Sequence, residues 1–72
     1  MSENVKKEIE NLTKTREEFY DFLDANIKKD SNDIYDFSDN PTLDAKSVYE
    51  LFYKLNYQAR KLRGSLYQTY NI

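Results

Sequence analysis

The apolar residues in the second half of the chain recur with the period of an α-helix, and this spacing limits the possible folds more than any other feature. Between residues 42 and 70 they stand alternately four and three residues apart, at Val48, Phe52, Leu55, Ala59, Leu62 and Leu66. Residues spaced in this way lie along one side of a helix. The sequence therefore predicts a helix over about 42–70 with one apolar seam.

A second helix is predicted over about residues 2–29. Its seam residues follow the same spacing and are Val5, Ile9, Leu12, Phe19 and Leu23. Ser2 can cap this helix, with Glu3 in its first turn and Lys28 and Lys29 in its last, which suits the helix dipole. Arg16 occupies a seam position: its stem can pack while its charge reaches water, it can set the register of the helices, or it can hold an anionic ligand between them.

Residues 30–41 form the predicted connector, which combines turn-forming residues with acids and contains no base. Its length allows a short helical turn, and Ile34, Tyr35 and Phe37 indicate that part of it packs against the helices. The following helix has two possible starts. Either Pro41 and Asp44 lie in its first turn, or Ser47 caps it in a capping box with Glu50, three residues further on.

Two long helices joined by one connector predict a single all-α domain over residues 1–72, an antiparallel helical hairpin. The chain has no cysteine, so disulfides cannot support its small core. A hairpin alone also leaves each seam half covered. We therefore expect a homo-oligomer, with a homodimeric four-helix bundle favoured.

Composition argues against an enzyme. The chain has no histidine, no cysteine and a single glycine, so it lacks the commonest general base, the thiolate nucleophile and a glycine-rich phosphate loop. An EF-hand loop counted from Asp30 fails, because Tyr35 falls at the required glycine and Pro41 at the bidentate acid. Carboxylate chemistry through Glu17 and Asp21 is conceivable, but a solvated acidic face is the simpler interpretation. We expect no cofactor and no metal.

The chain shows neither a secretory signal nor an apolar run of about 20 residues that could span a membrane. The expected location is therefore the cytoplasm, with no membrane partner. Asparagine, lysine, aspartate and tyrosine are abundant in this short chain. This composition is common among small phage and mobile-element proteins that block host enzymes.

The most informative pattern is a second face on the predicted helix over 42–70. At about 100° per residue, these residues cluster roughly 130° from the seam. They are Tyr49, Tyr53, Tyr57, Arg60, Gly64 and Tyr67, and we call them the tyrosine face. Tyrosine and arginine are enriched at binding hot spots, whereas Gly64 costs about 1 kcal/mol of helix propensity relative to alanine. The face can contact a different protein, pack on a second copy of the chain, or be an ordinary half-exposed aromatic surface.

A different function class follows from the bases of the same helix, Lys54, Arg60, Lys61 and Arg63, which could contact phosphates. A net charge of −2 weighs against nucleic-acid binding. The leading hypothesis is a small non-enzymatic binding protein, an inhibitor or adaptor that occupies a surface on a larger protein. The alternatives are an oligomeric nucleic-acid or nucleotide-ligand binding regulator and a self-assembling structural subunit.

Overall fold

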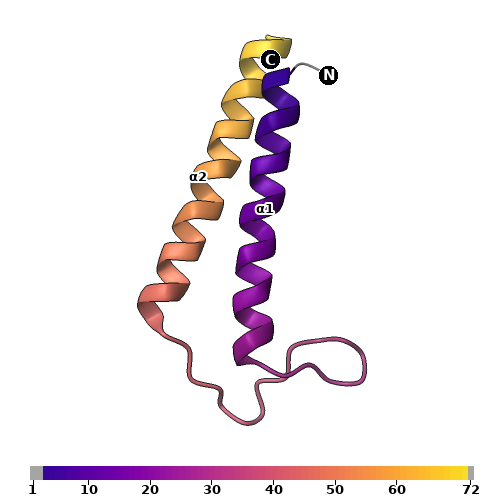
Figure 1. Cartoon of the computed structure of the whole chain (residues 1–72), viewed down its shortest axis with the longest axis vertical. Coiled ribbons are helices and arrows are strands. Elements are labelled where there is room, and N and C mark those ends of the chain that lie inside the picture. The colour runs from indigo at the N-terminus through magenta and orange to yellow at the C-terminus, as the bar shows by residue number, and fades with distance from the viewer. Residues whose placement is uncertain (1–2, 72) are drawn as a thin grey trace.

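The computed structural model describes residues 3–71 and contains two helices packed side by side. Helix α1 spans Glu3–Asn26 and helix α2 spans Ala45–Tyr70. They run antiparallel, so the start of α1 and the end of α2 lie at the same end of the hairpin (Figure 1). The predicted all-α hairpin is confirmed. Within residues 3–71, neither helix carries an apolar stretch long enough to cross a lipid bilayer.

Helix α1 ends three residues before its predicted end. Ile27 turns inward and is only 3% exposed, and its backbone N–H still donates to the carbonyl of Leu23. Lys28 and Lys29 therefore lie in the connector and not in the last helical turn. Lys28 forms an ion pair with Asp39 at 2.6 Å, and Lys29 pairs with Asp24 and Asp33 across 3.5 and 3.6 Å. The predicted cap, Ser2, lies outside the described residues.

Helix α2 begins at a position between the two predicted starts. Asp44 is its N-cap, and the Asp44 carboxylate accepts hydrogen bonds from the backbone N–H and the hydroxyl of Ser47 at 3.0 and 2.6 Å. Ser47 therefore lies inside the first turn and does not cap the helix. Its hydrogen bonds lower the pKa of Asp44, because they stabilise the carboxylate. At the other end Asn71 adopts φ 54°, a left-handed conformation that asparagine tolerates.

The connector, residues 27–44, contains turns and no helical turn. An isolated bridge pairs Lys29 with Tyr35 and closes a loop in which the Asp30 carboxylate accepts the backbone N–H groups of Asn32 and Ile34. Tyr35 is half-buried, as predicted for a packed part of the connector. The same prediction was wrong for Ile34 and Phe37, which are 62% and 59% exposed, because the loop turns them away from the helices.

Tyr35 fastens this loop to the end of α1. Its hydroxyl donates to the Asp24 carboxylate at 2.6 Å, and the Lys29 ammonium lies 5.0 Å from the centre of its ring. The hydrogen bond to Asp24 raises the pKa of Tyr35 to about 12 and lowers the pKa of Asp24. We call Asp24, Lys29 and Tyr35 the connector latch.

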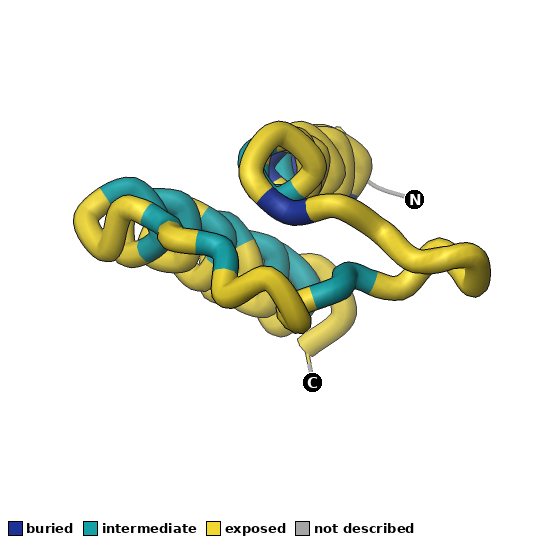
Figure 2. Tube along the Cα trace, turned by 90° about the horizontal axis from the view of Figure 1, so that it is seen from below, coloured by how far each residue is buried: buried dark blue, intermediate teal, exposed yellow. Residues whose placement is uncertain are grey.

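The face of α1 that packs on α2 is rotated from the predicted seam. Val5 is buried, and Leu12 and Phe19 are half-buried, as predicted. Two predicted seam residues, Ile9 and Arg16, are exposed, and the buried positions beside them belong to Glu8 and Thr15. The Val5, Glu8, Leu12, Thr15 series has the same helical spacing, so spacing alone does not choose between the two faces. Figure 2 shows the few buried positions on α1 and the half-buried ones along α2.

Helix α2 has no buried residue. Its half-buried positions include Leu55 and Leu62, as predicted, and also Leu51 and Gln58, which were not. Two further predicted seam residues are exposed: Phe52, at 57%, and Ala59. A single neighbouring helix covers only one side of α2, and these two residues lie beyond that side.

Candidate protein-binding face

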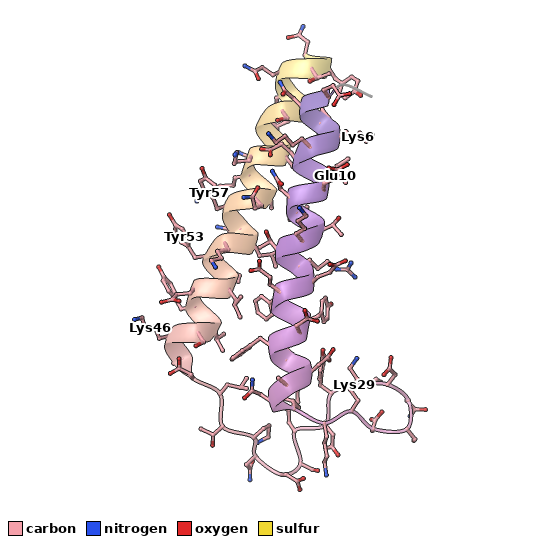
Figure 3. All side chains as sticks on the ribbon, in the orientation of Figure 1. Lys6, Glu10, Lys29, Lys46, Tyr53 and Tyr57 are labelled. Carbon is pink, nitrogen blue, oxygen red and sulfur yellow. The ribbon has the colours of Figure 1, made fainter. Side chains whose placement is uncertain are left out.

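The tyrosine face lies on the outer side of α2, although Tyr53 and Tyr57 also line a groove that they share with α1. All six of its residues are exposed. The four tyrosines keep roughly half of their surface open to solvent, with Tyr49 at 65% and Tyr57 at 45%. Figure 3 shows Tyr53 and Tyr57 projecting from the outer edge of α2. The helical period thus places the predicted residues on one continuous surface.

Two of these tyrosines form a hollow that could receive an apolar group. The rings of Tyr49 and Tyr53 are 6.4 Å apart and tilted by 34°. Together with Glu50 and Lys54 they line a shallow, open groove. Such a groove offers aromatic contact area beside charged groups of both signs, which is a common arrangement in protein recognition.

The packing within the hairpin does not require a glycine at position 64. Apart from its chain neighbours and the nearby backbone of α2 itself, a Cβ atom built at this position would have no heavy atom within 4 Å. Gly64 also has an ordinary helical backbone, since every positive φ among the described residues belongs to Asp33, Asn40 or Asn71. The packing of α1 on α2 therefore does not account for the glycine.

The four bases that could contact phosphates, Lys54, Arg60, Lys61 and Arg63, differ in their surroundings. Lys61 lies 3.6 Å from Glu8 of α1 and 5.7 Å from the ring centre of Tyr57, so it is held by its own hairpin. The Arg63 guanidinium lies 5.6 Å from the ring centre of Tyr67. Within residues 3–71 neither Arg60 nor Lys54 has an ion-pair partner. The four bases fan over about 180° of the helix at about 100° per residue, which is too wide for one stripe.

A polar layer between the helices was missed at the sequence level. Glu8 is 8% exposed and accepts a hydrogen bond from the Asn11 side chain at 2.9 Å, besides its pair with Lys61. Thr15, 9% exposed, donates to the carbonyl of Asn11. The Gln58 amide oxygen is also buried, and it has no hydrogen-bond partner among the described residues. These residues follow helical spacing, but they are polar, so a pattern of apolar residues does not identify them as buried.

The remaining exposed acids offer no arranged site. No group of three or more acidic side chains within residues 3–71 could hold a metal ion. In the connector, hydrogen bonds from Ser38, together with nearby Lys28, lower the pKa of Asp36. The Asp30 carboxylate accepts backbone N–H groups, and Asp39 forms an ion pair with Lys28.

No curated protein and no solved structure matches this chain. A family model described as CmeU-like matches residues 2–72, nearly the entire sequence. The chain therefore belongs to the CmeU-like family.

Proposed function

We propose that the protein is a small non-enzymatic helical binding protein that acts by occupying a surface on a larger protein, as an inhibitor or adaptor does. The tyrosine face is the proposed contact surface. The observation that carries the proposal is the exposure of four tyrosines along one side of α2, beside Arg60, which has no ion-pair partner among residues 3–71. The proposal includes action in the cytoplasm and, from composition, a phage or mobile-element type of protein.

The chemistry of the face favours a partner with an apolar ridge bordered by acceptors. Tyrosine buries a large ring with little loss of side-chain freedom, and its hydroxyl retains a hydrogen-bonding role. Arg60 can reach a carboxylate or backbone carbonyls of the partner. The open space at Gly64 lets the partner's backbone approach α2 closely.

The test is capture of a partner by the full chain, followed by affinity measurements with variants. Tyr53→Ala and Arg60→Ala should each weaken binding by more than about 1 kcal/mol without loss of helicity. Tyr70→Ala is the matched control, because Tyr70 is as exposed as Tyr53 on the same helix but outside the tyrosine face. Wild-type affinity in both face variants would refute the proposed contact surface.

The salt dependence of the same binding separates the competing function. Contacts to phosphates release counterions, so binding to nucleic acid through Lys54 and its neighbours would weaken steeply between about 50 and 200 mM salt. A protein held by tyrosine and arginine packing should change far less. Loss of the captured material on nuclease treatment would favour the nucleic-acid regulator over the inhibitor or adaptor.

A further inference from the structure

We propose that a second copy of the chain packs against one edge of the hairpin, which we call the apolar edge: Ile9, Tyr20, Leu23, Phe52, Leu55 and Ala59. This surface is separate from the tyrosine face. The proposal does not depend on the tyrosine face having a partner.

The two edges of the helix contact differ in chemistry. On one edge, Leu55 of α2 lines an open groove with Phe19, Tyr20, Leu23 and Arg16 of α1. The groove on the opposite edge is lined by Thr15, Glu18, Tyr53, Lys54, Tyr57 and Gln58, and so includes charged and amide groups. Only the first edge offers a largely apolar surface to a further helix.

Several exposed apolar residues lie on the same side as this first groove. At about 100° per residue, Phe52 and Ala59 lie about 60° and 40° from Leu55, turned away from the polar groove. Ile9 lies within about 20° of Tyr20 by the same count. Their exposed fractions are 57% for Phe52, 46% for Tyr20 and 39% for Ile9. The edge therefore carries exposed apolar residues from both helices.

The spacing of these residues identifies the kind of partner. Each helix carries two adjacent stripes, one facing the other helix and one on the apolar edge. On the edge, Ile9 and Leu23 are separated by two heptads, and Phe52 and Ala59 by one. A helix in a four-helix bundle needs two such stripes because it packs on two neighbours. Since both helices of the hairpin carry the second stripe, a second hairpin of equal length and period fits the edge.

The exposed area agrees with one further partner of this size. A compact folded protein of 8.7 kDa exposes about 4700 Å². The chain exposes 5774 Å². The excess of about 1000 Å² is close to the roughly 800 Å² that each partner buries in a standard protein interface. The hairpin thus lacks the burial that a two-fold dimer would supply.

Arg16 is compatible with burial beside this edge. Its guanidinium lies 5.2 Å from the ring centre of Tyr20, so the charge already rests on an aromatic face. The long stem can pack while the charged end reaches the rim of the interface.

The first experiment measures mass in solution over a wide range of concentration by sedimentation equilibrium. The full chain should reach twice 8.7 kDa. Phe52→Glu should raise the dimer dissociation constant by more than about tenfold, because the dimer would bury an unpaired carboxylate. Tyr53→Glu is the matched control on the adjacent residue, which is similarly exposed but faces away, and it should remain dimeric.

A second experiment does not require a variant that breaks the dimer. The chain has no cysteine, so a single introduced thiol can be labelled with maleimide without background. Ala59 and Gly64 are both exposed in the hairpin. In Ala59→Cys, labelling should slow by more than about tenfold as the dimer forms, whereas Gly64→Cys should react at one rate throughout.

Two outcomes would overturn the proposal. A wild-type chain that stays at 8.7 kDa at every concentration would mean that no second copy binds. A dimer that protects Gly64→Cys and leaves Ala59→Cys reactive would place self-association on the tyrosine face instead.

Discussion

Gly64 is the residue whose identity the hairpin explains least. It lies in the interior of α2, at the centre of an exposed face, where glycine weakens the helix relative to alanine. No neighbouring atom of the hairpin would meet a methyl group there. On our proposal, the absence of a side chain at Gly64 allows another molecule to approach α2 closely.

Gly64→Ala should accordingly raise the free energy of unfolding by about 1 kcal/mol, since alanine restricts the unfolded chain and favours the helix. Urea denaturation followed by circular dichroism measures the change. The same variant should bind the captured partner more weakly than the wild type does. A loss of stability would show that residue 64 contacts something within the chain or its oligomer that excludes a methyl group.

The connector is an element held by polar contacts more than by apolar burial. Its acids mostly cap turns or pair with lysine, and the connector latch ties it to the last turns of α1. This account of the acids is structural. It also explains why a segment with Ile34 and Phe37 exposed still has a defined course.

The latch should be visible in the titration of Tyr35. Its pKa, about 12, lies above the ordinary value of 10.0, so the folded chain favours the neutral phenol. The stabilisation is then complete below about pH 10 and is lost as the pH rises from there toward about 12. Nuclear magnetic resonance of ring-labelled tyrosine measures this directly. Asp24→Asn removes the accepting carboxylate and should return the pKa of Tyr35 toward 10.0, whereas a wild-type Tyr35 that already titrates near 10.0 would contradict the latch.

The whole molecule is an elongated object with little interior. It extends 48 × 27 × 17 Å, and its radius of gyration is 15.6 Å. A compact domain of this length would have a radius of gyration of about 11 Å. Val5 and Ile27 are the buried apolar residues of the described chain. So small a core makes association a natural source of further stability.

Thermal unfolding should therefore depend on protein concentration. If the folded dimer is the stable species, mass action raises the unfolding midpoint as the concentration increases. Circular dichroism melts at several concentrations measure this for the wild type and for Tyr53→Glu, which should behave alike. Phe52→Glu should melt lower, with a midpoint nearly independent of concentration. A concentration-independent midpoint in the wild type would argue for a hairpin that is stable alone.

The sequence by itself determined the two helices, their antiparallel hairpin and the separation of the tyrosine face from the seam. These features depend on helical period and on a break near Pro41, both of which are local properties of the chain. The exact residues at which the helices begin and end could not be predicted from these local properties. Lys28 and Lys29 lie beyond the end of α1, where they pair with Asp39 and Asp33 of the folded connector. Asp44 caps α2 by accepting the backbone N–H of Ser47.

Only the tertiary structure decided which side of each helix faces the other. In α1, Ile9 and Arg16 follow the predicted spacing, but Glu8 and Thr15 lie one residue earlier and become buried. Both choices satisfy a helical period, and the contact between the helices selects one, with Glu8 beside Lys61 of α2. The physical reason is the width of the apolar stripe. One neighbouring helix cannot cover all of it, so part of the stripe stays exposed, and the sequence does not specify which part.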